Sequence, residues 1–344
     1  MNPATANAVS AGTGHDVIVI GASAGGVEAL KKVAAGLPPA LPASLFVVLH
    51  RTGPRSMLAS LLNRWGPLPA VDARDGMIIE HGMIYVAPPD RHLLLQMGTV
   101  RVARGPKENR HRPSIDPLFR SAAWAYGPRV IGVLLSGTLS DGTAGLWAIR
   151  SCGGQVVVQD PTDSPYPGMP TSALETLDAD YCVPAAQIGA LVGRLAHLPA
   201  ADRRDFPVPE QVKLESSMVQ MQTDDEIRAV DKLGKLTPFT CPACHGSLWE
   251  IDDEHVLRYR CHTGHAFTAD ALETEHDEAL EAALFSALRA LEESAAIARR
   301  VARRARDREQ DKSATTFDEK ARRAESDAES IRDLLRGKRQ AASD

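Results

Sequence analysis

The stretch that decides the fold is "DVIVIGASAGGVEALKKV", residues 16–33, where a short apolar run breaks at a glycine-rich corner and a helical pattern follows. A continuous run rich in β-branched residues is typical of a parallel strand that is covered on both faces. A glycine-rich corner between a strand and a helix has two common meanings, a dinucleotide-binding loop or a nucleophile elbow. The residues around the corner favour one of them.

A dinucleotide-binding loop needs glycine where the backbone approaches the pyrophosphate and an acidic residue at the end of the second strand. This chain has Ser23 at the second glycine position, and its second apolar run, "SLFVVLH", ends in His50. The elbow pattern G-x-S-x-G fits residues 21–25 letter for letter. An elbow leaves the serine hydroxyl exposed at a helix N-terminus, where free N–H groups stabilise an oxyanion.

The rest of the first half alternates strand-like and helix-like segments up to about residue 198. The expected strands include "VIVIGA", "SLFVVLH", "MIYVAP", "RVIGVLLSG", "QVVVQD" and "DYCVP". Amphipathic segments such as "SMLASLLNRW" and "DPLFRSAAWAYG" separate them. This order predicts an α/β fold with a doubly wound, mostly parallel sheet. Residues 76–105 contain turn residues between short alternating runs, which predicts an antiparallel β insertion.

Three residue types suited to acyl transfer follow three expected parallel strands. Ser23 follows the first strand, His50 ends the second, and Asp141 lies in "TLSDG" after "RVIGVLLSG". Parallel strands present their C-terminal ends at one edge of the sheet, so these side chains are expected to meet. A serine nucleophile needs a base, and the base needs a carboxylate that fixes its tautomer. Other candidates for the base are His81, His92 and His111, and Asp160 is the other candidate for the carboxylate.

Six linked motifs in residues 16–197 resemble the catalytic domain of the chemotaxis protein-glutamate methylesterases. The motifs are "VIGASAGGVEAL", "VVLHR", "YVAPPDRHLLL", "RPSIDPLFRSAA", "LLSGTLSDGTAGL" and "GMPTSAL". The resemblance implies a serine esterase that hydrolyses γ-glutamyl methyl esters on chemoreceptors, releases methanol, and also deamidates receptor glutamines. It implies Ser23 as nucleophile, His50 as base and Asp141 as the orienting acid, with no cofactor for catalysis.

The surroundings of this triad give further expectations. Backbone N–H groups of Ala24, Gly25, Gly26 and Thr138 are expected to hold the oxyanion. The family often has Thr at position 24 and Met at position 138, so a different substrate groove is an open alternative. Three arginines flank "PSIDPLF" and are candidates for steering an acidic receptor helix, the alternative being a solvated charged face. These arginines are Arg110, Arg112 and Arg120.

A cysteine and histidine module follows at residues 237–268. It contains the pair Cys241 and Cys244, then Cys261 and His265, each pair on a tight turn. This spacing predicts a zinc ribbon in which structural zinc has four protein ligands and no open position for catalysis. His262 is the other candidate for the fourth ligand.

The remaining regions are simpler. We expect a disordered N-terminus over 1–15, a catalytic domain over 16–198, a polar linker over 199–236 and a helical tail over 269–344. Apolar seams at alternating spacings of four and three residues in the tail predict two long helices that form a hairpin or pair two chains as a dimer. The first seam runs through Leu280, Leu284, Ala287, Leu291, Ser294, Ala298, Val301 and Ala305. Full-length family members begin with a receiver domain, for which we expect no room before residue 17.

Composition limits the classes of function. The net charge is -5 at pH 7, which argues against a nucleic-acid specialist. The N-terminus lacks the features of a secretion signal, and no apolar run is long enough to span a bilayer. We therefore expect a cytoplasmic protein without membrane insertion. Two alternatives to the methylesterase are an adaptor protein on an esterase fold and an esterase for another substrate.

Overall fold

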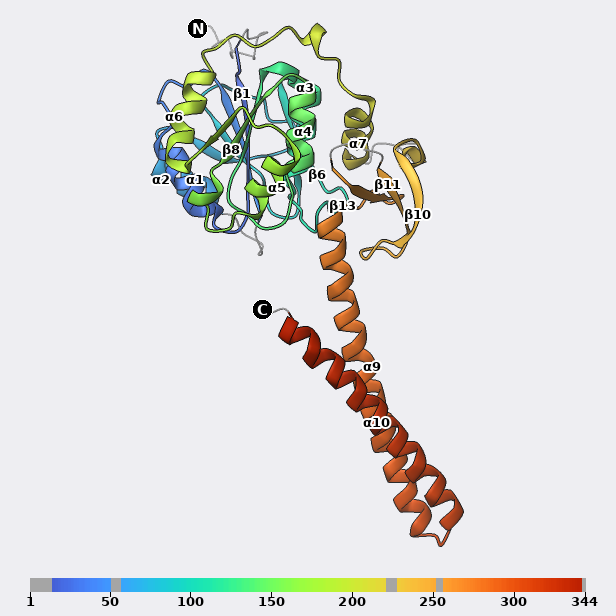
Figure 1. Cartoon of the computed structure of the whole chain (residues 1–344). Helices are drawn as coiled ribbons and strands as arrows, with labels where there is room; N and C mark the ends of the chain where they lie inside the picture. The colour runs from blue at the N-terminus through green and yellow to red at the C-terminus, as the bar shows by residue number, and fades with distance from the viewer. Residues whose placement is uncertain (1–13, 51–56, 221–227, 252–255, 342–344) are drawn as a thin grey trace, which may run out of the picture. The chain divides into compact units, whose positions relative to one another are not determined.

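The computed structural model describes residues 14–50, 57–220, 228–251 and 256–341. The chain divides into two compact units, one up to Leu272 and one from Glu273 onward (Figure 1). Parts of three expected regions lie outside the described residues. They are positions 1–13 of the N-terminus expected to be disordered, 221–227 of the expected linker and 252–255 of the expected ribbon.

The first unit is built on a seven-stranded sheet in which every neighbouring pair is parallel. Its strand order is β3-β4-β2-β1-β7-β8-β9, so β1 lies at the centre between β2 and β7. The predicted doubly wound α/β sheet is therefore confirmed. The strands are β1 (Val17–Ala22), β2 (Ser44–Leu49), β3 (Ala70–Asp72), β4 (Ile84–Val86), β7 (Val130–Leu134), β8 (Gln155–Gln159) and β9 (Tyr181–Val183).

Helices cover both faces of this sheet, which explains why its central strands are uninterrupted apolar runs (Figure 1). Alternate residues of β1 point to opposite faces: Ile18 and Ile20 into one core, Val17 and Val19 into the other. The first core is closed by α1 (Gly26–Ala35), α2 (Leu58–Trp65) and α6 (Ala185–Leu195). The second is closed by α3 (Ile115–Tyr126), α4 (Thr143–Ser151) and α5 (Gly168–Thr176).

The predicted antiparallel insertion is present over part of residues 76–105, as a two-stranded hairpin of β5 (His92–Gln96) and β6 (Thr99–Ala103). Strand β4 from the same range instead pairs in parallel within the main sheet. Leu93, Leu95 and Val100 of this hairpin are buried in the second core. The insertion is therefore part of the packed domain.

The stretch expected to be a polar linker contains the helix α7 (Glu210–Gln220). Val212 and Met218 of α7 are buried, and so are the polar residues Glu215 and Ser216. Because polar residues lie on the buried side, the apolar periodicity that would indicate a helix is interrupted. The domain boundaries remain predictions.

A small antiparallel sheet follows α7 and forms the ribbon. Its core contains Cys241, Leu248, Tyr259, Cys261 and Phe267. The strands are β10 (Gly234–Thr240), β11 (Ser247–Ile251), β12 (Arg258–Cys261) and β13 (Ala266–Thr268), in that spatial order.

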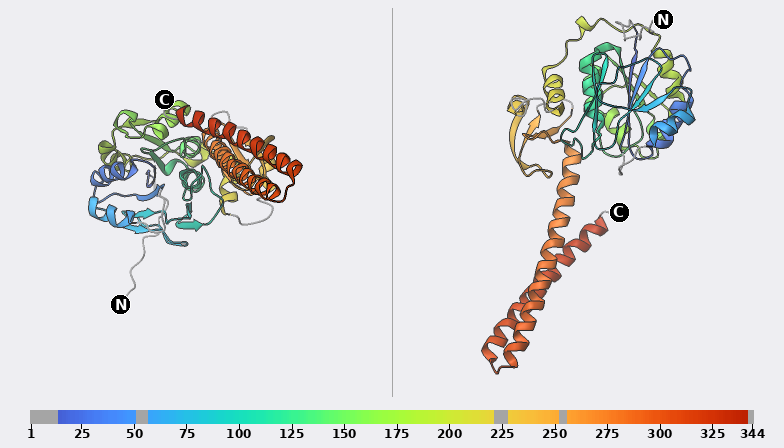
Figure 2. Two further views of the ribbon diagram at one scale, coloured as in Figure 1. Left: turned by 90° about the horizontal axis from the view of Figure 1, so that it is seen from below. Right: turned by 180° about the vertical axis from the view of Figure 1, so that it is seen from behind.

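Two long helices, α9 (Ala269–Arg306) and α10 (Asp311–Ala341), form a hairpin that makes up the second unit from Glu273 onward (Figure 2). Ion pairs Arg299–Glu325 and Arg332–Glu292 connect them in antiparallel order. The predicted seam is wrong in part, because Ala295 and Ala302 are buried where Ser294 and Val301 were expected. Alanines at the contact let the two helices approach closely. Pairing of two chains through these helices remains a prediction.

Within the described part of the chain, we find no helix with both the length and the apolar character needed to cross a membrane.

Candidate active site and metal centre

Three neighbouring strands place Ser23, His50 and Asp141 at one edge of the sheet. Ser23 follows β1, His50 follows β2, and Asp141 lies in the loop after β7. The backbone ladder extends into these loops, because the N–H of His50 donates to Ala22 O at 3.0 Å and that of Ser23 donates to Ser136 O at 2.9 Å. The sheet itself therefore fixes where the three side chains start.

The three side chains form a continuous hydrogen-bonded chain. His50 Nδ1 lies 3.1 Å from Ser23 Oγ, and His50 Nε2 lies 2.7 Å from Asp141 Oδ2. Asp141 is acceptor-only when ionised, so the imidazole proton is on Nε2 and Nδ1 is free to accept the serine proton. The His50 and Asp141 side chains are 4% and 3% exposed. This arrangement has the parts of a serine nucleophile with its base.

Asp141 lies at the N-terminus of α3, whose free N–H groups favour negative charge. Burial opposes ionisation of Asp141, but the hydrogen bond and charge of His50 and the other donors outweigh it and hold the pKa of this carboxyl well below its usual range. The carboxylate is therefore ionised at neutral pH. Its donors are His50 Nε2, Asn109 Nδ2, Ser114 Oγ and the backbone N–H groups of Ile115 and Asp116.

A four-residue turn, Glu108 to His111, brings further side chains to the site. The N–H of His111 donates to Glu108 O at 2.9 Å, and that of Glu108 donates to His111 O at 3.3 Å. Asn109 and Arg110 between them have φ of 47° and 73°, as in the tight turns that join β-hairpins. Asn109 reaches Asp141, and His111 stacks on His50. No sequence pattern indicated Asn109, and His111 was a candidate only for the base.

His111 does not replace His50 as the base, because it lies on the face of the His50 ring. Burial, and next the neighbouring His50, lower the pKa of His111 to about 4. The His111 ring is therefore neutral at pH 7. A neutral ring stacked on His50 limits its rotation without competing for its proton.

The other candidates for base and acid lie outside this chain of hydrogen bonds. His81 pairs with Asp16 at 3.4 Å. The buried His92 ring contacts Pro106 O and accepts from the N–H of Ser114. Asp160 caps the short helix that follows β8, accepting a hydrogen bond from the N–H of Thr162.

The predicted oxyanion donors lie at the N-terminus of α1 and in the loop after β7. The N–H of Gly26 already donates to Ser23 O at 2.9 Å, which closes the turn. Gly25 has φ of 73°, and a Cβ there would lie 2.6 Å from Ser136 Oγ, so the corner requires glycine. The predicted roles of Ala24, Gly25, Gly26 and Thr138 remain predictions.

The three candidate arginines do not share one surface environment. Arg112 is half-buried and donates to Asp90 Oδ1 at 2.6 and 2.8 Å. Arg110 is half-buried in the turn. Arg120 is 2% exposed and donates to Glu108 Oε2 at 2.6 Å, so its burial leaves it no face toward a substrate.

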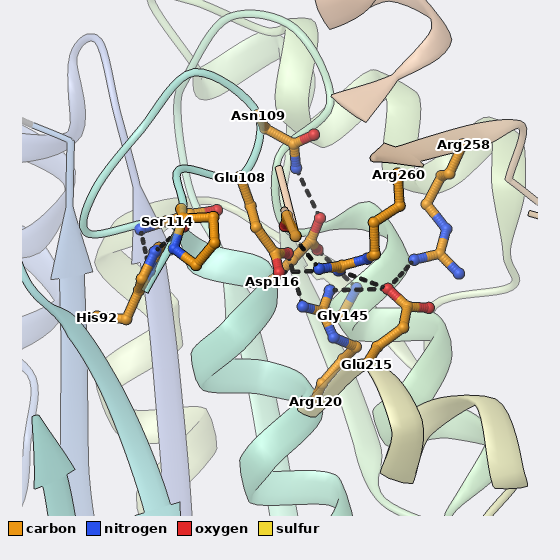
Figure 3. Close-up of polar contacts among 12 residues, drawn as sticks. His92, Glu108, Asn109, Ser114, Asp116, Arg120, Gly145, Glu215, Arg258 and Arg260 are labelled. Atoms are coloured by element: carbon orange, nitrogen blue, oxygen red, sulfur yellow. Dashed lines mark hydrogen bonds and ion pairs between the residues drawn. The ribbon is translucent and has the colours of Figure 1, made fainter. Parts of the chain in front are cut away.

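Arg120 belongs to a buried ion cluster that joins α3, α7 and β12 (Figure 3). Arg260 Nη2 lies 2.8 Å from Glu108 Oε1 and 2.9 Å from Glu215 Oε2. Five charged side chains, all 5% exposed or less, thus form ion pairs with one another. The cluster consists of Glu108, Arg120, Glu215, Arg258 and Arg260.

The ribbon brings together Cys241, Cys244, Cys261 and His265, whose ligand atoms all lie within 4.8 Å of one another. Cys244 Sγ and Cys261 Sγ are 3.7 Å apart, and Cys261 Sγ and His265 Nδ1 are 3.5 Å apart. A tetrahedral zinc with Zn–S bonds of about 2.3 Å has S···S edges of about 3.8 Å. The donors and their spacing therefore fit a zinc ion. His262 is exposed and lies outside this group.

Comparison with known proteins connects the first half of the chain to one family. A family model described as CheB methylesterase matches residues 18–192. The chain is 45% identical over 160 residues to protein-glutamate methylesterase/protein-glutamine glutaminase 3 of Anaeromyxobacter dehalogenans (strain 2CP-C), which covers 46% of this chain and 47% of that relative. It is 39% identical over 188 residues to a putative protein-glutamate methylesterase/protein-glutamine glutaminase of Leptospira interrogans, which covers 53% of this chain and 95% of that relative.

A solved structure agrees with these matches. The catalytic domain of Thermotoga maritima CheB methylesterase is similar with a TM-score of 0.50 and 34% sequence identity, covering 52% of this chain and 98% of that one. The chain spans about half the length of the Anaeromyxobacter relatives that it matches.

Proposed function

The chain belongs to the CheB methylesterase family, and from this premise we propose that it hydrolyses γ-glutamyl methyl esters on chemoreceptors and releases methanol. The observation that carries the proposal is the hydrogen-bonded chain from Ser23 through His50 to Asp141 at the sheet edge. An adaptor protein would not need a serine, a histidine and an aspartate connected by hydrogen bonds in this order.

The proposed mechanism is acyl transfer in two steps. His50 Nδ1 accepts the proton of Ser23 as Oγ attacks the ester carbonyl, and the same proton then goes to the departing methoxide. Asp141 fixes the His50 tautomer and stabilises the imidazolium. Backbone N–H groups at Ala24, Gly25 and Thr138 hold the oxyanion. Water, deprotonated by His50, then releases the glutamate and regenerates Ser23.

The same steps support deamidation of receptor glutamines, as the second half of the relatives' name describes. The leaving group is then ammonia, which takes the proton held by His50. Arg110 and Arg112 are the proposed contacts for an acidic receptor helix.

We also propose that Cys241, Cys244, Cys261 and His265 hold a structural zinc. When bound, the ion supplies folding free energy to the ribbon and leaves no open coordination position. Thiolate ligands persist in a reducing compartment, which supports a cytoplasmic location.

Methanol release from methylated receptor by the wild type and by Ser23→Ala tests the proposal. The Ser23→Ala rate should fall about 10⁴-fold, by comparison with other serine triads. Ser151→Ala is the matched control, because its hydroxyl donates to Trp147 O at the end of α4 and takes no part in the triad. Near-normal methanol release by Ser23→Ala would refute Ser23 as the nucleophile.

A further inference from the structure

The ribbon is docked directly on the turn that carries Asn109. The N–H of Asn109 donates to Ala266 O at 2.8 Å, and the N–H of Ala266 donates to Lys107 O at 3.4 Å. Glu108 and Ala266 form a parallel bridge. The start of strand β13 therefore pairs with the backbone of this turn as a neighbouring strand would.

The side chain of Asn109 connects β13 to Asp116 and Asp141. Figure 3 shows its bond to Asp116. Its Oδ1 accepts from the N–H of Thr268 at 3.0 Å. Its Nδ2 donates to Asp141 Oδ1 at 2.9 Å and to Asp116 Oδ2 at 2.7 Å. The amide orientation is fixed, because an N–H faces its oxygen and two carboxylates face its nitrogen. Asn109 is 5% exposed, so water does not replace these partners readily.

The amide also separates two buried acids. Asp116 is buried, and this burial, together with the nearby Asp141, raises the pKa of Asp116. Without the Asn109 N–H groups, Asp141 loses a donor and faces Asp116 directly. The position of Asp141, and through it the His50 ring, then becomes less well defined.

The turn itself needs support from outside. Asn109 and Arg110 both have φ in the left-handed region, which is unfavourable for a residue such as Arg110. The pairing with β13 and the ion pair from Arg260 to Glu108 hold this conformation. The backbone conformation of the turn thus depends on residues that lie more than 140 positions later in the sequence.

A second contact joins the ribbon to the loop that carries Asp141. Ser140 Oγ lies 2.9 Å from Thr268 Oγ1 and 2.7 Å from Asp270 Oδ1. Ser140 is buried and immediately precedes Asp141. Residues from Ala266 to Asp270 therefore support the orienting acid from both sides.

The segment that makes these contacts starts directly after the metal ligands. Within the knuckle from Cys261 to His265, the N–H of Cys261 donates to His265 O at 2.9 Å and that of Gly264 donates to Cys261 O at 2.9 Å. A metal ion bound by Cys261 and His265 closes this knuckle and fixes the start of β13 at Ala266.

We propose that the metal-bound ribbon is a positioning module for the triad, in which β13 holds Asn109 and Asn109 holds Asp141. This inference rests on the proposed esterase function. Asn109 is a positioning residue that acts through Asp141, and zinc acts through Asn109. Loss of zinc therefore lowers the reactivity of Ser23, although the ion is not part of the chemistry.

The test measures the rate at which a fluorophosphonate labels Ser23 in the full chain, with zinc bound, after chelation and after zinc is added back. Chelation should lower the wild-type rate about 10- to 100-fold, and added zinc should restore it. Asn109→Ala with zinc bound should show a similar reduced rate. Chelation of Asn109→Ala should then lower the rate by no more than about the threefold to tenfold expected for the Ser140 contact, because that contact is the remaining connection described here.

A second readout reports the position of the acid. The downfield proton resonance of His50 Nε2–H, donated to Asp141, should shift or broaden by NMR in the chelated wild type and in zinc-bound Asn109→Ala. Asn63→Ala is the matched control, because the Asn63 amide also bonds three backbone groups but lies between α2 and β3. It should lose stability yet keep both the labelling rate and the resonance.

Ser140→Ala keeps the test decisive if Asn109→Ala does not fold. It removes only the hydroxyl that contacts Thr268 and Asp270, and its labelling rate should fall about threefold to tenfold. A folded, zinc-free wild type that labels as fast as the zinc-bound protein would overturn the inference and leave the esterase proposal standing. Failure of zinc-bound wild type to label at Ser23 would instead remove the proposed function.

Discussion

The ring of His111 is stacked on the ring of His50, with centroids 3.6 Å apart and planes inclined by 18°. The two residues come from different parts of the domain, His50 from the end of β2 and His111 from the turn that precedes α3. The stack restrains the one side chain that must contact both Ser23 and Asp141.

The first prediction concerns this stack. His111→Ala should lower kcat about tenfold, because His50 gains freedom to rotate away from Ser23. His111→Phe keeps an aromatic face and should stay within about threefold of wild type. Because the pKa of His111 is lowered to about 4, His111→Phe should also leave the pH profile unchanged above about pH 5. A change in the profile in that range, such as the loss of a titration seen in the wild type, would contradict a neutral His111.

The second prediction concerns the orienting acid. Asp141→Asn preserves the shape of the side chain but can donate to His50 Nε2 and favour the wrong tautomer, so kcat should fall about 10⁴-fold in methanol release. Asp160→Asn is the control, since Asp160 caps a short helix after β8 and should leave kcat near wild type. Equal losses in the two variants would argue against the assignment of the acid.

The third prediction concerns the buried ion cluster. Burial disfavours the charge of Glu215, but Arg258, Arg120 and Arg260 more than offset it and hold the pKa of Glu215 well below its ordinary value of 4.5. Glu215→Gln should lower the free energy of unfolding at neutral pH by about 3–5 kcal/mol, because buried guanidinium groups lose a partner.

The pH dependence of this loss follows from the lowered pKa. Below about pH 4.5 the unfolded chain binds a proton at Glu215 before the folded chain does, so this contribution to stability is complete above that pH and is lost as the pH falls further. Urea unfolding should therefore show the gap between wild type and Glu215→Gln narrowing in acid. Glu210→Gln, on the exposed side of α7, should show almost no gap at any pH.

The fourth prediction concerns the metal ligands. Wild type should bind one zinc per chain, and His265→Ala should bind it at least about tenfold more weakly, as measured by competition with a chromogenic chelator. His262→Ala is the control and should keep wild-type affinity, because His262 is exposed and outside the ligand group. Loss of zinc in His262→Ala alone would reverse the assignment.

The α/β sheet and the edge where Ser23, His50 and Asp141 meet could be predicted from the sequence. Buried parallel strands have continuous runs of β-branched residues in the sequence, and their parallel order places their C-terminal ends at one edge of the sheet. Short or polar elements left no such signal. Strand β3 has three residues, and α7 turns Glu215 and Ser216 inward.

The support around the triad could not be predicted in this way. The role of Asn109 depends on its contact with β13, which lies more than 150 residues later in the sequence. No local sequence pattern therefore indicates this role. Arg120 looked like a surface charge because its partners Glu108 and Glu215 come from two other segments of the chain. In the tail, a strict alternation of four and three placed the seam on Ser294 and Val301, one residue away from the buried alanines.

The ion cluster has a consequence for where this chain can be cut. Glu108 and Arg120 lie inside the family-matched segment 18–192, but Glu215 and Arg260 lie beyond it. A fragment ending at residue 192 would leave Arg120 with one acid in place of two and uncover Glu108. The family-matched segment is therefore shorter than the compact unit that contains it, and a truncation that keeps the ion cluster whole has to extend beyond Arg260.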